Sequence, residues 1–142
     1  MGKVKDILDS KGYGAYTVEP PTTVYVAIEQ MCARNIGGVL IVEDGKLLGI
    51  FTERDYARKL ILKGKSSKET PIRELMTANP FTVSPESSIE QCMQLMTDKH
   101  IRHLPVTEGD KIIGLISIGD VVGHVIQEQK SIIQHLESYI SQ

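Results

Sequence analysis

The chain has 142 residues, of which 41% are hydrophobic and 24% are charged, and its formal net charge is −2. This length suits one ordinary domain or two very small ones, with enough apolar side chains to bury a core. The nearly balanced charge lacks the basic excess that nucleic acid or anionic lipid selects, so we expect no nucleic-acid partner.

Apolar runs in the sequence are all far shorter than the roughly 20 residues that a helix needs to cross a bilayer. The N-terminal residues Met1–Asp6 show neither an apolar export segment nor an Arg-rich and Ser-rich import pattern. We therefore predict a cytoplasmic protein without a membrane span. Cys32 and Cys92 lie far apart and lack metal-ligand spacing, so each is expected to act as a small apolar residue on a helix.

The sequence repeats itself at a shift of 65 positions, and the two copies match without a gap over most of their length. Three of the matched pairs are Thr17 with Thr82, Gly49 with Gly114, and Asp55 with Asp120. A prelude also recurs, because Val4–Leu8 is similar to Ile72–Met76, but at a shift of 68. The first copy therefore carries three extra residues in the loop at positions 12–16.

Each copy predicts the element order β-α-β-β-α. In the first copy, Thr17 and Val18 form a short strand, and apolar residues at helical spacing from Val24 to Cys32 predict an amphipathic helix. Two apolar runs at 39–42 and 46–51, separated by an Asp-Gly turn, then predict a hairpin. A second helix is expected at 52–62.

The second copy predicts a helix at 88–99, strands at 104–106 and 111–116, and a helix from 117 onward. The fold class is therefore mixed α/β (α+β), with two tandem units packed as one pseudo-two-fold module, because neither unit covers its small sheet alone. We place the first repeat with its prelude helix at 4–63, a linker at 64–71, the second repeat with its prelude helix at 72–126, and a helical extension at 127–142. The polar linker is either a solvated loop or an anion-binding segment.

The last segment continues an apolar stripe beyond the length of its first-copy counterpart. Beyond Lys130, the stripe contains Ile132, Ile133, Leu136 and Ile140 at roughly helical spacing. No part of the repeat remains to cover these side chains. We expect them to pack on a second subunit or back across the module.

The sharpest recurring element is glycine, two apolar residues, a hydroxyl residue, two variable residues and aspartate. It occurs at Gly49–Asp55 and at Gly114–Asp120, each time where a strand leads into a helix. One interpretation is a capping box, in which the hydroxyl and the acid bind orphan amides of the first turn. The other is a ligand site, because a helix N-terminus accepts phosphate and a carboxylate accepts the hydroxyls of a ribose.

On these residues, the repeat resembles the cystathionine-β-synthase (CBS) domain, and the whole chain resembles a stand-alone CBS pair, or Bateman module. The resemblance runs from the prelude near Val4 to the helix after Asp120. It implies adenosine ligands in the cleft between the repeats: AMP, ADP or ATP, and in some relatives NAD(H) or S-adenosylmethionine. It also implies a homodimer, since CBS pairs commonly assemble as disc-like dimers, and a regulated partner protein.

Carried over to this chain, the resemblance gives Asp55 and Asp120 the ribose hydroxyls, while Thr52 and Ser117 face the phosphate. Backbone groups of four further residues would border the adenine, namely Thr17, Val18, Thr82 and Val83.

The two predicted sites differ in their basic residues. The second copy has Arg102 and His103 at the start of the strand that also contains Pro105, and these positions often contact phosphate in the family. The first copy has Gly37 and Gly38 there, and its basic residue is Arg54 inside the Thr-x-x-Asp element. The resemblance thus implies two non-equivalent sites, with the second better suited to a nucleoside monophosphate.

The basic pair Arg102 and His103 also has an ordinary interpretation as a solvated edge. A metal pair of His100 and His103 lacks a third ligand. The sequence contains no P-loop, no nucleophile elbow and no paired carboxylates in an apolar setting, so we predict neither a catalytic nor a metal site. The expected function is ligand sensing; the alternatives are an interaction module with vestigial sites and a nucleotide-processing enzyme.

Overall fold

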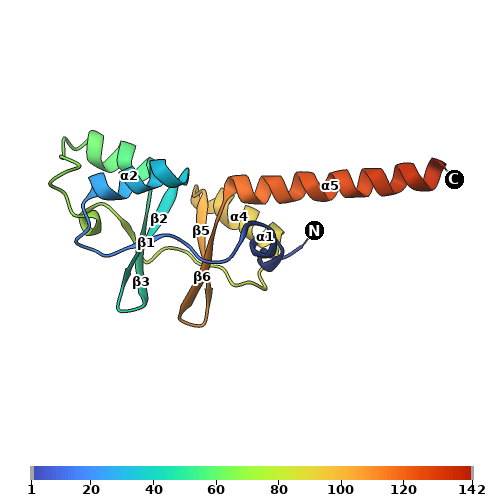
Figure 1. Cartoon of the computed structure of the whole chain (residues 1–142), viewed down its shortest axis with the longest axis horizontal. Coiled ribbons are helices and arrows are strands. Elements are labelled where there is room, and N and C mark those ends of the chain that lie inside the picture. The colour runs from blue at the N-terminus through green and yellow to red at the C-terminus, as the bar shows by residue number, and fades with distance from the viewer. Residues whose placement is uncertain (1, 142) are drawn as a thin grey trace. The chain divides into compact units, whose positions relative to one another are not determined.

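The computed structural model describes residues 2–141, which divide into two compact units. Unit 2 contains residues 14–81 and 108–113, and unit 1 contains the residues up to Tyr13, residues 82–107 and the residues from Gly114 onward. Along the chain, the elements of Figure 1 are α1 (Val4–Lys11), β1 (Thr17–Val18), α2 (Val24–Arg34), β2 (Gly38–Glu43), β3 (Lys46–Thr52), α3 (Glu53–Asp55), η1 (Tyr56–Ile61), η2 (Ile72–Glu74), β4 (Thr77–Ala78), α4 (Ile89–Lys99), β5 (His103–Glu108), β6 (Lys111–Ser117) and α5 (Ile118–Ser141).

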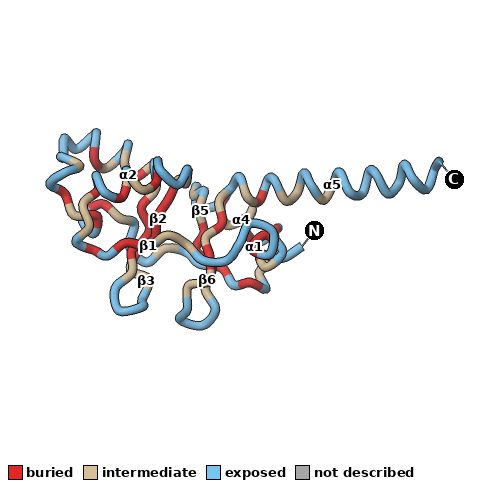
Figure 2. The backbone as a smooth tube through the Cα atoms, viewed as in Figure 1, coloured by how far each residue is buried: buried red, intermediate tan, exposed pale blue. Residues whose placement is uncertain are grey.

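Unit 2 is built on a four-stranded sheet in the order β1-β2-β3-β4. The predicted hairpin is confirmed, since β2 pairs antiparallel with β3 and the turn residues Asp44 and Gly45 both have positive φ, at 51° and 77°. Strand β1 pairs parallel with β2, with Thr17 opposite Leu40, and β4 pairs antiparallel with β3. The core contains apolar side chains from α2, β2 and β3, including Met31, Val39 and Phe51 (Figure 2).

The predicted linker is ordered by its contacts with α2. The amides of Val24 and Tyr25 donate to the carbonyl oxygens of Thr70 and Ser67, at 2.9 Å each. The side chain of Thr23 accepts from the third amide of this turn. The linker therefore caps the N-terminus of α2, and these amides are not available to an anion.

The second helix of the first copy has two parts. Residues Glu53–Asp55 form one α-helical turn, and Tyr56–Ile61 continue as a π-helix rather than the regular helix that the sequence pattern predicts. Within this wider segment Leu60 is buried, and Lys59 pairs with Asp55 at 3.2 Å. Adjacent residues of this turn thus pack into the core, through Leu60, and bind the Asp55 carboxylate, through Lys59.

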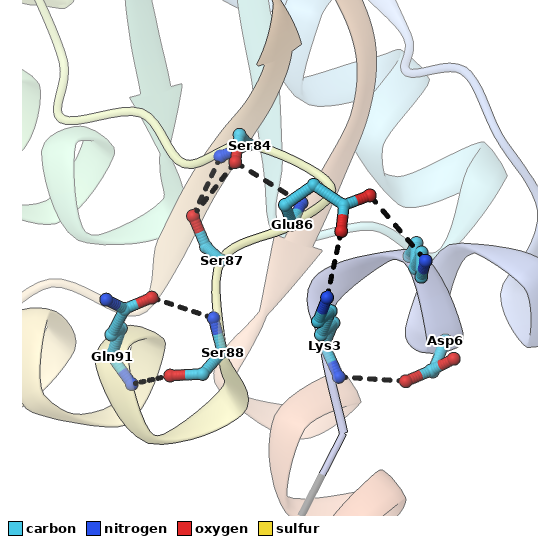
Figure 3. Close-up of polar contacts among 8 residues, drawn as sticks. Lys3, Asp6, Ser84, Glu86, Ser87, Ser88 and Gln91 are labelled. Atoms are coloured by element: carbon cyan, nitrogen blue, oxygen red, sulfur yellow. Dashed lines mark hydrogen bonds and ion pairs between the residues drawn. The ribbon is translucent and has the colours of Figure 1, made fainter.

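Unit 1 combines α4, most of the β5-β6 hairpin and α5 with helix α1, the prelude of the first copy. The amides of Val4 and Lys5 donate to the carbonyl oxygens of Ser87 and Pro85, and Lys3 pairs with Glu86 at 3.0 Å. Figure 3 shows Lys3 and Glu86 beside the capping box that Ser88 and Gln91 form at the start of α4. The ammonium groups of Lys3 and Lys5 lower the pKa of the Glu86 carboxyl from its ordinary value.

The prelude of the second copy lies in unit 2, so each unit contains the prelude of the other copy. This prelude is a single 3-10 turn, η2, and not the predicted helix. The amides of Ile72 and Arg73 donate to the carbonyl oxygens of Thr22 and Pro20, at 2.7 and 3.2 Å. The turn does not extend into an α-helix, because Thr77 and Ala78, three residues after Glu74, already pair with β3 as strand β4.

Helix α5 changes from a packed to an exposed helix along its length. Val121 in its first turn is fully buried, whereas every residue from Gln129 to Ser141 is exposed (Figure 2). No helix in residues 2–141 combines the length and the apolar character needed to cross a membrane.

The two cysteines have different environments. Cys92 on α4 is fully buried, and burial raises the pKa of its thiol to about 11. The expectation of an apolar role is therefore met at Cys92, but it is wrong for Cys32, which is exposed.

The recurring glycines, Gly49 and Gly114, allow the preludes to approach β3 and β6 closely. A Cβ at Gly49 would lie 2.6 Å from Met76 Sδ and 2.8 Å from the carbonyl oxygen of Thr77. A Cβ at Gly114 would lie 2.7 Å from Leu8 Cδ2, which is the end of a flexible side chain. Glycine is required most strictly where the neighbouring atom belongs to the backbone.

We predict that Gly49→Ala destabilises the protein more than Gly114→Ala. The first substitution must displace backbone, an overpacking effect that typically costs about 1–3 kcal/mol, whereas Leu8 can rotate away from the second. Urea unfolding of the two variants beside the unchanged chain measures the difference. A larger loss of unfolding free energy for Gly114→Ala contradicts the prediction.

Candidate functional site

The first copy's candidate site is the junction of β3 and α3. The amide of Thr52 donates to Asp55 Oδ2 at 3.0 Å, and the amide of Asp55 donates to Thr52 Oγ1 at 3.3 Å. This is a capping box, which confirms the first interpretation of the repeated element. The hydroxyl of Thr52 also donates to Asp55 Oδ2, at 3.2 Å.

The other carboxylate oxygen of Asp55 is also occupied. Oδ1 accepts from Thr77 Oγ1 at 3.2 Å and pairs with Lys59 Nζ at the same distance. Lys59 Nζ in turn donates to Thr77 Oγ1. With 8% of its surface exposed, Asp55 is a buried carboxylate that uses both oxygens to bind protein groups.

The second copy repeats the capping box at the junction of β6 and α5. The amide of Ser117 donates to Asp120 Oδ2 at 2.8 Å, and the amide of Asp120 donates to Ser117 Oγ at 3.1 Å. Oδ2 also pairs with Lys11 Nζ from α1 at 2.7 Å. The side chain of Asp120 is 24% exposed, against 11% for that of Asp55.

The two carboxylates thus differ in how many of their oxygens are free to accept a hydrogen bond from a ligand. Within residues 2–141, Oδ1 of Asp120 has no hydrogen bond or ion pair with a protein group, whereas Oδ1 of Asp55 has two such contacts. A ligand hydroxyl can bind Asp120 without displacing a protein donor. At Asp55 it competes with Thr77 and Lys59.

Arg102 and His103 lie beside the second carboxylate along the backbone. The amide of Ile118, which follows Ser117, donates to the carbonyl oxygen of Arg102 at 2.8 Å. The side chain of Arg102 is exposed, and His103, the first residue of β5, is half-buried. The same backbone bond in the first copy joins Glu53 to Gly37, where no basic side chain is present.

The residues expected to border adenine form strand β1 in the first copy, but in the second copy the predicted first strand is reduced to an isolated bridge at Val83. Val83 pairs parallel with Val106, and its amide donates to the carbonyl oxygen of the buried Pro105 at 3.0 Å. In unit 2, Thr17 and Val18 line an open pocket of about 550 Å³. The opposite wall of that pocket is formed by Val42–Gly45.

The structure brings some candidate residues together and separates others. Thr52 pairs with Gly38 at one end of the β2-β3 hairpin, whereas the pocket beside Thr17 reaches the turn at the other end. Half-buried Arg54 lies in α3 between Thr52 and Asp55. In the second copy, backbone hydrogen bonds join Thr82's neighbour Val83 to β5 and join Arg102 to the start of α5. The candidate residues of each copy therefore occupy the strand and helix ends around one small hairpin.

Sequence reasoning missed three polar groups at the carboxylates: Lys11, Lys59 and Thr77. Lys59 carries a detectable signal, because it lies four residues after Asp55 on the same helix. Lys11 ends α1, and Thr77 begins β4 just after the second prelude; the two positions do not correspond in the repeat, so no sequence signal indicated these contacts. Within residues 2–141, no three His, Cys, Asp or Glu side chains gather as a metal site would require.

A family model of the CBS domain matches residues 4–62 and again residues 72–127. The chain belongs to the CBS domain family. The resemblance noted in the sequence and the mixed α+β class are therefore confirmed. The chain is a pair of CBS domains, and the ligand roles of its individual residues stay predictions.

Several CBS proteins are similar over most of the chain. The solved structure of a CBS-domain protein from Burkholderia ambifaria is 48% identical, with a TM-score of 0.87, over 90% of this chain and 96% of that one. The mitochondrial CBS domain-containing protein CBSX3 of Arabidopsis thaliana is 42% identical over 96% of this chain and 71% of its own length. CBSX2, solved in complex with AMP, is 25% identical, with a TM-score of 0.72, over 91% of this chain and 99% of that one.

Proposed function

We propose that this CBS pair is a non-catalytic regulatory module that binds an adenosine nucleotide and signals its presence to a partner protein. The observation that carries the proposal is that, within residues 2–141, no protein group binds Oδ1 of Asp120, at a helix start where the Ser117 hydroxyl caps the first turn and the Arg102 carbonyl oxygen accepts the Ile118 amide. A carboxylate oxygen accepts ribose hydroxyls, and a basic side chain with a hydroxyl suits phosphate. The AMP complex of the related CBSX2 supports the same ligand class.

The second copy is the stronger candidate for the nucleotide. It combines the Asp120 carboxylate, of which only Oδ2 is bound by the described protein groups, with Arg102 and His103, whereas both oxygens of Asp55 are bound and the first copy has two glycines in place of the basic pair. Thr82, Val83 and Pro105 would complete the second site. NAD(H) as a ligand and a cytoplasmic location remain predictions.

A second role, docking of a protein partner, is favoured by the exposed stripe on α5. Its apolar side chains are more than half exposed, at 53% for Ile132, 55% for Leu136 and 81% for Ile140. We propose that a second copy of the chain covers them, because a two-fold interface is the commonest way to bury a self-complementary surface.

We expect AMP to raise the thermal midpoint of the protein. A ligand that binds only the folded state adds roughly 2.7 kcal/mol of stability at 100 times its Kd. Melting curves with AMP, ADP, ATP and NAD(H) up to millimolar concentration test this, with guanosine monophosphate as the control for base recognition. Unchanged midpoints with all four adenosine ligands reject adenosine sensing and leave docking as the function.

Asp120→Asn should weaken AMP binding more than Asp55→Asn. Asparagine keeps a side-chain oxygen for the helix cap but removes the charge, and a hydrogen bond to a charged group is typically worth about 1.5–3 kcal/mol, or roughly tenfold or more in affinity. Isothermal calorimetry on the two variants compares the losses. Equal losses, or a larger loss at Asp55, assign the nucleotide to both copies or to the first.

We predict a homodimer that weakens when the chain is shortened to end at Lys130. Burying each large apolar side chain of the lost stripe contributes roughly 1.5–3 kcal/mol. Light scattering at tens of micromolar compares the full and shortened chains. In the full chain, Leu136→Glu should act like the truncation, and Gln134→Glu is the matched control on the opposite face. A full-length monomer, or an equally tight shortened dimer, rules out this interface.

A further inference from the structure

Lys11 joins the prelude of the first copy to the carboxylate of the second. Its ammonium group binds two acceptors, Asp120 Oδ2 at 2.7 Å and the carbonyl oxygen of Leu115 at 2.8 Å. Both acceptors belong to the junction of β6 and α5. The side chain is 40% exposed, so the ion pair with Asp120 lies at the edge of the protein and is partly screened by solvent.

The helix that carries Lys11 is firmly placed in unit 1. Val4 and Leu8 on the same helix are fully buried, and Leu8 lies against Gly114, just before Leu115. The lysine therefore approaches Asp120 from a fixed backbone position. Lys5, nearer the start of the helix, pairs with Glu86 at 3.6 Å instead.

The contact decides which oxygen of Asp120 is available. Oδ2 accepts from both the Ser117 amide and Lys11, which holds the carboxylate in one orientation and leaves Oδ1 to a ligand. The ammonium also offsets the negative charge of Asp120, which would otherwise repel the phosphate of a nucleotide bound beside it.

We propose that Lys11 is a positioning residue of the nucleotide site, which orients Asp120 and makes the site tolerant of anionic ligands. This inference rests on the proposed function and adds to it a selectivity for AMP over the uncharged nucleoside adenosine. Without Lys11, the neutral nucleoside adenosine still meets a carboxylate that accepts its ribose, whereas AMP also meets an uncompensated negative charge. The ratio of AMP affinity to adenosine affinity therefore reports on Lys11.

The test measures that ratio by calorimetry for the unchanged chain and for Lys11→Met, Lys11→Gln and Lys11→Arg. Lys5→Met is the matched control, because it removes the same charge from the same helix. We expect Lys11→Met and Lys11→Gln to lower the ratio roughly fivefold at low salt and less at high salt, since screening weakens the repulsion. Lys11→Arg and Lys5→Met should keep the ratio.

Lys11→Gln keeps a donor for the Leu115 carbonyl oxygen, so it separates loss of charge from loss of folding if Lys11→Met melts at a lower temperature. Equal losses for AMP and adenosine in both neutral variants would show a purely structural lysine and overturn the inference. A lowered ratio in Lys5→Met would also overturn it, because the effect would then be general to the charge of α1. If neither AMP nor adenosine binds the unchanged chain, the proposed function itself is wrong. If both bind and the neutral Lys11 variants leave the affinity ratio unaltered, only the role proposed for Lys11 is wrong.

Discussion

A carboxylate in the first turn of a helix is the interaction on which each unit depends. Asp55 and Asp120 bind the amide at the end of the preceding strand, which satisfies an otherwise unpaired donor where the strand leads into the helix. Each carboxylate also binds a group from the segment that carries the other copy's prelude, Thr77 at the start of β4 in one unit and Lys11 at the end of α1 in the other. A carboxylate that is largely removed from water needs such partners, because an unpaired charge there is costly. Strand, helix and prelude therefore meet at one side chain in each unit.

Close packing by the preludes explains why glycine opens the repeated element. Only a residue without a Cβ lets the backbone of Thr77 approach β3, and glycine also makes room for the Leu8 side chain beside β6, although that side chain could rotate away. This approach brings the prelude groups within hydrogen-bond distance of the carboxylates. The repeated seven-residue element therefore does two things: its hydroxyl residue and aspartate cap the helix, and its glycine allows a neighbouring segment to pack closely.

The secondary structure was predicted from local periodicity, and the prediction failed where tertiary contacts determine the local structure. The two hairpins and the helices α2, α4 and α5 were predictable because alternation, helical spacing and the turn residues are encoded within a few residues. The 3-10 turn at Ile72–Glu74 was not, because its length is limited by the pairing of the following residues, Thr77 and Ala78, with β3, a tertiary contact that no local pattern encodes. The π-helix at Tyr56–Ile61 shows no pattern that differs from a regular helix. For the candidate site, the repeat identified both aspartates, but their unequal occupancy depends on Lys11 and Thr77, which no spacing rule places there.

Helix α5 joins the two roles proposed for the protein. Its first turn holds Asp120, and its exposed stripe begins about three turns later, on the same continuous helix of 24 residues. A nucleotide that binds Asp120 changes the charge and contacts at the start of this helix, while a second copy would bury its far end. If nucleotide binding alters the affinity of one copy for another by some factor, thermodynamic linkage requires that association alters nucleotide affinity by the same factor. The helix can carry such a coupling only if the nucleotide favours one arrangement of α5 over another, because equal binding to both arrangements shifts neither equilibrium.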